Sequence, residues 1–172
     1  MKAYVRGKSV YLRETTVDDA DFIVRLRTDA NKSKHLSPTA DNIGQQKDYI
    51  CRYLTSRTEY YFIICGWDNN PVGTIRIYDI QNDSFCWGSW ILSDEAPPNA
   101  SIESALLIYD FAFYSLHYKK SHFDVRKENQ RVVAFHQRFG AIIVREDEIN
   151  YYFQYSQEDY LKTRQRYLRY LP

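Results

Sequence analysis

Hydrophobic residues recur at helical spacing along one long stretch in the second half of the chain. From Ser101 to Leu116 the intervals of three and four residues are those of one helical face. The residues at these intervals are Ile102, Ala105, Leu106, Tyr109, Phe113 and Leu116. The other sides of the same stretch are also apolar, at Leu107, Ile108, Phe111 and Ala112. A helix that is apolar nearly all round is expected to lie buried between layers of structure.

Runs rich in β-branched and aromatic residues predict strands on both sides of that helix. These runs cover residues 9–13, 60–67, 72–78, 85–92, 122–126, 142–144 and 151–155. Apolar periodicity and capping signals at Thr16 and Ser156 predict further helices over residues 17–27, 43–57 and 157–171. Asn129 and Gly140 are suited to begin and end another short helix. The mixture of elements predicts an α/β fold.

Composition and charge narrow the class of protein. A chain of 172 residues is long enough for one domain with a real core, so residues 1–172 are predicted to form a single domain. The net charge of +1 favours neither nucleic acid nor a membrane surface as partner. Three cysteines without a pairing or metal-binding pattern favour a reducing compartment. With no signal-like start and no long apolar run, the predicted location is the cytoplasm, and no metal is expected.

The order loop, apolar helix, strand, short helix and glycine resembles the core of the GNAT superfamily of acyl-CoA-dependent N-acyltransferases. The family's pyrophosphate loop, Arg/Gln-x-x-Gly-x-Gly/Ala, corresponds to residues 95–100, where Ala100 fits the last position. The family's Asn-x-x-Ala/Ser-x-x-Leu-Tyr-x-x-x-Gly-Phe pattern corresponds to residues 129–141. Asn129 and Gly140 match at the right separation, while His136 stands at the tyrosine position.

The resemblance implies a GNAT fold and acetyl-CoA as co-substrate. The implied fold is a mixed, mostly antiparallel sheet of six or seven strands, with helices on both faces and a splayed central strand pair. In that family a β-bulge frees backbone groups that pair with the pantetheine arm, and a helix N-terminus binds the pyrophosphate. The residues that the resemblance assigns to the cofactor are Trp90, Ile91, Leu92, Asn99, Ala100, Ser101, Ile102, Asn129 and His136.

Several residues are candidates for the catalytic groups. His136 can protonate the leaving thiolate as an imidazolium or accept a proton from the amine as a neutral ring. His35 and Asp79 are further candidates for the general base, by their position near the acceptor end. Cys86 stands close to the place where family members often carry a glutamate base. A water relay to a remote carboxylate is a further alternative.

The predicted reaction is transfer of an acetyl group from acetyl-CoA to a primary amine on a small molecule. The segment from Lys34 to Thr39 resembles the ribosomal-protein-type branch of the family and its amino-sugar relatives. A nucleotide-linked amino sugar is therefore the first choice of acceptor. The alternatives are the N-terminus of a protein, and a degenerate GNAT domain that binds a ligand without catalysis. Exposed tyrosines and the C-terminal helix make a homo-oligomer conceivable.

Overall fold

The computed structural model describes residues 4–36, 38–56 and 58–172, and its centre is one sheet of eight strands. The strand order is β1-β2-β3-β4-β5-β6-β8-β7, and among the described residues only the β5–β6 pair is parallel. Ser37 in the predicted loop motif and Arg57 at the predicted end of a helix lie outside the described residues. The strands are β1 (Tyr4–Arg6), β2 (Val10–Glu14), β3 (Tyr60–Gly66), β4 (Pro71–Gln81), β5 (Ser84–Leu92), β6 (Lys120–Arg126), β7 (Ile142–Glu146) and β8 (Asn150–Ser156).

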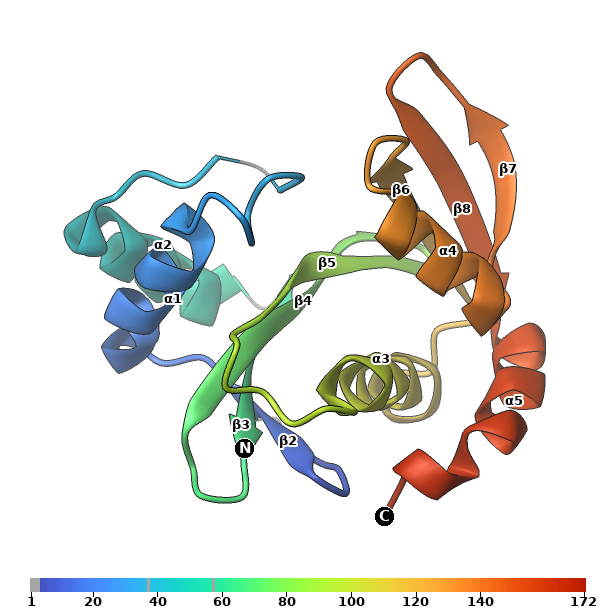
Figure 1. The fold of residues 1–172 in the computed structure, drawn as a ribbon, viewed down its shortest axis with the longest axis horizontal. Helices are drawn as coiled ribbons and strands as arrows, with labels where there is room; N and C mark the ends of the chain where they lie inside the picture. The colour runs from blue at the N-terminus through green and yellow to red at the C-terminus, as the bar shows by residue number, and fades with distance from the viewer. Residues whose placement is uncertain (1–3, 37, 57) are drawn as a thin grey trace.

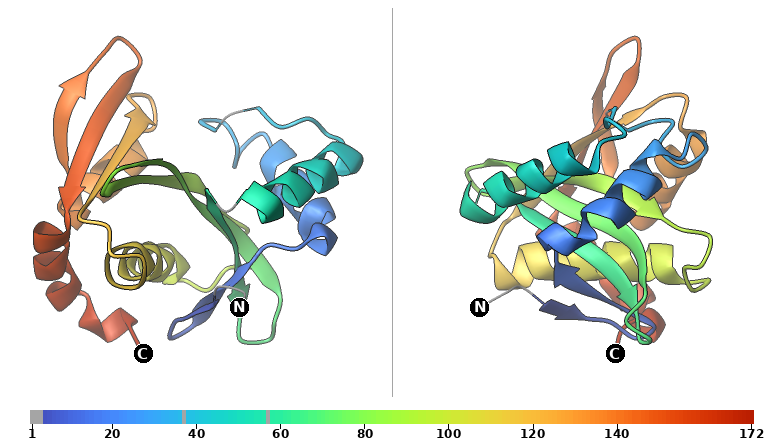
Figure 2. Two further views of the ribbon diagram at one scale, coloured as in Figure 1. Left: turned by 180° about the vertical axis from the view of Figure 1, so that it is seen from behind. Right: turned by 90° about the vertical axis from the view of Figure 1, so that its left-hand side faces the viewer.

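Helices cover both faces of the sheet, as predicted (Figure 1). One face carries α1 and α2, and the other carries α3 and α4, with α5 packed beside β8 (Figure 2). The helices are α1 (Ala20–Thr28), α2 (Ile43–Ser56), α3 (Ala100–Asp110), α4 (Gln130–Phe139) and α5 (Gln157–Arg166). The α/β class is confirmed. Within the described residues, no helix combines the length and the apolarity needed to cross a bilayer.

The sheet has eight strands where six or seven were expected. The additional strand is β1, which pairs with β2 in an antiparallel hairpin through the turn at residues 7–9. Its three residues are too few to show an alternating pattern, and the strand lies at the sheet edge. The strand is therefore defined by its pairing with β2, and local periodicity in the sequence does not reveal such pairing.

Most of the local signals at the helix ends behave as predicted. The backbone N–H of Thr16 donates to the carboxylate of Asp19 at 2.7 Å, which completes a capping box. Ser156 accepts from the N–H of Asp159 at 3.0 Å and caps α5. Gly140 ends α4 with φ of +106°, a left-handed conformation that glycine adopts without strain. Asn129 holds the position before α4, although its side chain makes no capping hydrogen bond.

Two hydrophobic cores lie on the two faces of the sheet. The larger fills the space between the sheet and α3, and it is dominated by stacked and edge-on aromatic rings such as Tyr109, Phe113 and Tyr160. The smaller lies under α1 and α2, around Ile23 and Ile50. The predicted burial of α3 between layers is confirmed, because its apolar residues are enclosed nearly all round. Both cores hold the central strands in fixed positions.

The strands β5 and β6 separate soon after they meet, so the expected splayed pair is present. They pair only at Ser84 with Lys120 and at Phe85 with Ser121. Further along β5, the register with β4 shifts between Thr74 and Arg76. Ser89 lies at this bulge with φ of +48°, a conformation rare outside glycine. Figure 1 shows β5 and β6 diverging beside α3 and α4.

Candidate functional site

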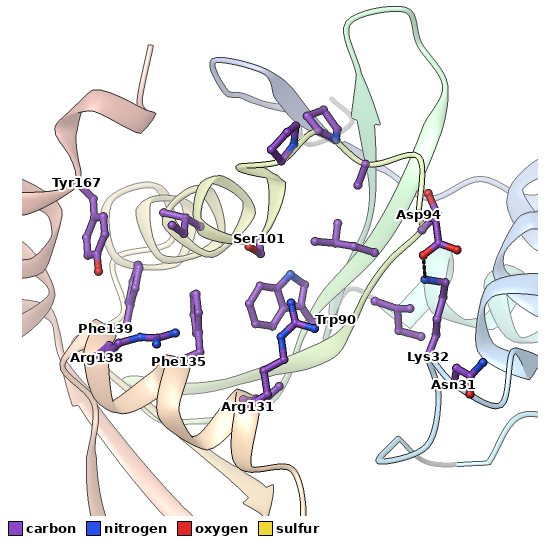
Figure 3. Close-up of a pocket in the computed structure, with 18 residues that line it drawn as sticks. Asn31, Lys32, Trp90, Asp94, Ser101, Arg131, Phe135, Arg138, Phe139 and Tyr167 are labelled. Carbon is purple, nitrogen blue, oxygen red and sulfur yellow. Dashed lines mark hydrogen bonds and ion pairs between the residues drawn. The ribbon is translucent and has the colours of Figure 1, made fainter.

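A cleft of about 750 Å³ opens where β5 leaves β6 (Figure 3). Its walls are the end of β5, the loop that follows, the start of α3, and one side of α4. The rim also contains Asn31 and Lys32, which belong to the α1–α2 segment, residues 29–42. The lining residues are Asn31, Lys32, Trp90, Ile91, Leu92, Ser93, Asp94, Ala96, Pro97, Pro98, Ser101, Ile102, Arg131, Val132, Phe135, Arg138, Phe139 and Tyr167.

The cleft brings together some of the residues predicted to bind the cofactor. Those that line it are Trp90, Ile91, Leu92, Ser101 and Ile102. Asn99 instead lines a neighbouring depression, and Ala100 is fully buried at the start of α3. Asn129 and His136 are absent from the described lining of the cleft, although both belong to the segment that forms its α4 wall. The residues predicted to bind the cofactor thus divide into those that line the cleft and those that do not.

The N-terminus of α3 faces the cleft and is suited to an anion. The N–H of Ala100 donates to the carbonyl of Pro97 at 2.9 Å. For Ser101 and Ile102 no backbone acceptor is found among the described residues outside the helix, as expected for a first helical turn. These N–H groups and the positive end of the helix dipole favour a phosphate. Pro97 and Pro98 offer no N–H, so the backbone donors begin at Asn99, the residue before the helix.

Three cations in the cleft were not identified from the sequence. Arg131 and Arg138 lie on one side of α4, with Phe135 between them, and Lys32 reaches the rim from the α1–α2 segment. The spacing of four and then three residues places the α4 side chains on one helical face. From this spacing, the two arginines could have been predicted from the sequence to share one face of the helix. Guanidinium groups at this position suit the phosphates of a nucleotide.

Lys32 also connects two parts of the molecule across the mouth of the cleft. Its ammonium group lies 2.7 Å from the carboxylate of Asp94, in the loop before α3 (Figure 3). The Asp94 side chain is 93% exposed, so the pair adds little to stability. The contact nevertheless positions the α1–α2 segment against the cleft.

The edge of β5 that borders the cleft is available for pairing with an extended ligand. Beyond Phe85, no described residue of β6 pairs with β5. The bulge is held by Thr74, whose hydroxyl donates to the carbonyl of Ser89 at 2.7 Å. An amide-bearing arm can lie along such an edge as an additional strand. The strand edge, the helix N-terminus and the cations together fit the pantetheine arm and phosphates of an acyl-CoA.

His136 lies behind the cleft wall in an aromatic environment. Its ring is 4.4 Å from that of Phe123 and 5.3 Å from that of Trp87, measured between ring centroids. Burial lowers the pKa of His136 to about 3, so the ring is uncharged at neutral pH. No hydrogen-bond partner of its Nδ1 is found among the described residues. Of the two predicted roles, the imidazolium acid does not fit this protonation state.

A second group of polar residues faces the α1–α2 side of the sheet, where β5 and β6 part. The hydroxyl of Ser84 lies 2.5 Å from Nδ1 of His122, and Nε2 of His122 lies 3.0 Å from the carboxylate of Asp79. Asp79 adopts φ of +46°, and its hydrogen bond with His122 lowers its pKa. His122 is the first β6 residue beyond the paired positions. This arrangement can accept a proton at the histidine and stabilise the resulting charge.

Asp79 was predicted from the sequence as a candidate base, whereas His122 was not. The alternation of side chains in β6 places His122 on the face opposite Phe123. This placement could have been predicted from the sequence. Cys86, on the same face, stays a neutral thiol, because burial raises its pKa to about 12. His35 lies half-buried in the α1–α2 segment, and it belongs to neither the described lining of the cleft nor that of the cavity under α2. No cluster of potential metal ligands occurs within the described residues.

Comparisons with known proteins agree with this geometry. The family model of the acetyltransferase (GNAT) domain matches residues 9–142. No curated protein sequence gives a significant match. The solved structure of apo FdhC, a nucleotide-linked sugar GNAT, is similar over 100% of both chains, with 36% identity and a TM-score of 0.92.

More distant structures share the fold alone. The spermidine N-acetyltransferase from Vibrio cholerae, in complex with CoA and spermine, is similar over 89% of this chain and 98% of its own, with 17% identity and a TM-score of 0.80. A GNAT-family acetyltransferase from Bacillus anthracis is similar over 91% of this chain and 99% of its own, with 12% identity and a TM-score of 0.78.

Proposed function

Because this chain belongs to the GNAT family and is an acetyl-CoA-dependent N-acetyltransferase, we propose that its acceptor is the amino group of a nucleotide-linked sugar. The observation that carries the proposal is the similarity to the nucleotide-linked sugar GNAT over the full length of both chains. The spermidine acetyltransferases are less than 25% identical, so they support only the shared fold. The two sheet faces provide separate places for the two substrates.

In this proposal, acetyl-CoA occupies the cleft between β5 and α4. Its pyrophosphate lies at the first turn of α3, against the N–H groups of Ser101 and Ile102. Arg131, Arg138 and Lys32 supply the remaining positive charge. The pantetheine arm runs along the free edge of β5, which directs the thioester toward the point where β5 and β6 part.

The acceptor amine approaches from the α1–α2 face, where His122 lies at the opening between the strands. The amine nitrogen attacks the thioester carbonyl, a C–N bond forms, and the C–S bond breaks to release CoA. We assign the amine proton to His122, oriented by Asp79 and Ser84. The imidazolium formed can then return the proton to the departing thiolate.

Release of the CoA thiol from acetyl-CoA, followed with a thiol reagent, tests the acceptor class. The panel contains uridine- and thymidine-diphosphate-linked amino sugars, the matching free amino sugars, spermidine and a peptide with a free N-terminus. We expect kcat/KM for a nucleotide-linked amino sugar to exceed that for its free sugar by about 100-fold, because binding energy from the nucleotide contributes to the transition state. Equal or better turnover of the free sugar, spermidine or the peptide would contradict the proposal.

A further inference from the structure

A smaller cavity of about 310 Å³ lies on the other face of the sheet, where α1 and α2 pack. Its lining contains three arginines and, among the described residues, no carboxylate. We call it the arginine cavity after Arg27, Arg52 and Arg76. The other lining residues are Pro38, Thr39, Ala40, Asn42, Gln45, Gln46, Tyr49 and Tyr61. The three arginines come from α1, α2 and β4, so the fold assembles this charge from distant parts of the sequence.

Arg76 is held at the base of the cavity by aromatic residues. Its guanidinium carbon lies 4.3 Å from the ring centroid of Tyr78 and 5.8 Å from that of Tyr61. One terminal nitrogen donates to the hydroxyl of Tyr49 at 2.6 Å. Its Nε is buried, and no acceptor for it is found among the described residues. Glu59, which does not line the cavity, approaches Arg76 only to 3.8 Å. The guanidinium is thus positioned, with donor capacity remaining.

The other two arginines complete a rim of donors. Arg27 donates from Nε to the hydroxyl of Thr39 at 2.5 Å, which fixes its side chain beside the cavity. Arg52 lies exposed on α2, where its charge faces solvent at the entrance. Planar guanidinium groups bind phosphate oxygens in pairs, which a lysine cannot reproduce. The small volume and this charge fit one or two phosphate groups and disfavour a polyamine.

The position of the arginine cavity relates it to the reacting atoms. Arg76 is paired across the sheet with Gly88 on β5, next to the bulge at Ser89. Neighbouring strands lie about 4.8 Å apart, so the cavity is roughly one strand away from the opening between β5 and β6. His122 borders that opening on the same face. A ligand held here by its phosphates can extend a sugar toward the thioester.

We propose that the arginine cavity binds the diphosphate of the nucleotide-linked acceptor, an inference that rests on the proposed function. The cavity fixes the anionic part of the acceptor on the face opposite the acetyl-CoA cleft. The two phosphate-bearing substrates then bind separate cation clusters, Arg131 and Arg138 for the cofactor and the three cavity arginines for the acceptor. Recognition of the acceptor is thereby separated from the chemistry at its amino group.

Calorimetric titration of uridine diphosphate and thymidine diphosphate into CoA-saturated protein tests this inference. Saturation with CoA fills the cleft, so any further nucleotide binding reports a different site. We expect Arg52→Gln and Arg76→Lys each to weaken nucleoside diphosphate binding by about tenfold, with CoA affinity unchanged. Arg25→Gln is the matched control, because Arg25 is an exposed α1 residue paired with Asp21 and does not line the cavity. Retained CoA affinity reports that each variant is folded.

Two results of the binding experiment overturn the inference. One is the absence of nucleoside diphosphate binding to the CoA-saturated parent protein. The other is equal binding to the parent, Arg52→Gln and Arg76→Lys. Turnover separates this inference from the proposed function. If the variants lose nucleotide binding but the parent acetylates no amino-sugar nucleotide, the cavity assignment is retained and the proposed acceptor is rejected. If the parent acetylates an amino-sugar nucleotide and neither substitution changes this turnover, the proposed acceptor is retained and the cavity assignment is rejected.

Discussion

At the scale of single residues, the structural environments of two histidines reverse the order of importance that the sequence motif suggests. His136 stands at a family motif position, yet it is 5% exposed and surrounded by aromatic rings. His122 belongs to no motif, yet it bridges Ser84 and Asp79 beside the opening between β5 and β6. A proton carrier needs access to the substrate and a partner for its charge. The second histidine meets these conditions.

His122→Gln is expected to lower kcat by about 100-fold, the lower end of what a positioned general base contributes. Acetyl-CoA affinity is expected to stay unchanged, because His122 does not line the cleft. The matched control is His117→Gln, an exposed residue in the turn between α3 and β6. Steady-state kinetics over a pH series measure both. A kcat equal to that of the control would refute the role of His122.

His136→Phe is expected to alter the pH dependence of stability. The pKa of His136 is about 3 in the folded state, against about 6.5 in an unfolded chain. Above pH 6.5 both states are neutral. Below it, only the unfolded chain binds the proton, so the parent loses stability as the pH falls toward 3.

At pH 5, about 1.5 units below the ordinary pKa, this linkage costs the parent about 2 kcal/mol. His136→Phe removes that loss, because phenylalanine cannot be protonated. Urea unfolding of both proteins at pH 7 and pH 5 measures the difference. An identical pH dependence in parent and variant would show that His136 is not buried as a neutral ring.

At the scale of elements, α3 is attached to the first hairpin through a buried carboxylate. Glu103 in the first turn of α3 is 1% exposed. It accepts hydrogen bonds from the N–H of Ser9 at 2.7 Å, the N–H of Val10 at 3.0 Å and the hydroxyl of Ser9 at 2.5 Å. As an acidic residue in the first turn, Glu103 complements the dipole of α3. The structure shows that it also fixes the start of α3, and with it the cleft, relative to β2.

Glu103→Gln is expected to lower the free energy of unfolding by about 2 kcal/mol, because an amide cannot accept all the hydrogen bonds that the carboxylate accepts. Glu148→Gln is the matched control, since Glu148 is exposed in the turn between β7 and β8. Urea denaturation measures both variants. Equal stability of the two variants would mean that the contacts of Glu103 with β2 add nothing to stability.

At the scale of the whole molecule, the sheet separates two binding regions that meet at one opening. The cleft between β5 and α4 lies on one face, and the arginine cavity lies on the other. The bulge at Ser89 and the short pairing of β5 with β6 create the opening between them. Such separation would let acetyl-CoA and the proposed nucleotide-linked acceptor bind without displacing each other.

Acetyl-CoA is expected to slow amide hydrogen exchange along β5 between Trp87 and Leu92, because the pantetheine arm pairs with the free strand edge. At ligand concentrations about 100 times Kd, the slowing can reach about 100-fold where exchange requires ligand release. β7, at the far edge of the sheet, is the internal control and is expected to exchange as before. Protection of β7 with no change along β5 would contradict this binding mode.

The sequence by itself determined the elements and their general arrangement. Apolar spacing identified α3 as a buried helix, the capping residue Ser156 located the start of α5, and Gly140 marked the end of α4. These features depend on interactions between residues close together in the chain, which local periodicity reports directly. The family resemblance at Asn129 and Gly140 added three further predictions, which are the family, its co-substrate and the splayed strand pair.

Only the tertiary structure decided which side chains share an environment. The low pKa of His136 follows from burial among rings supplied by other elements. The link between Asp79 and His122, and the meeting of Arg27 with Arg76, join residues more than forty positions apart in the chain. Burial, cavities and hydrogen bonds between distant residues depend on how elements pack, and no local pattern encodes that packing.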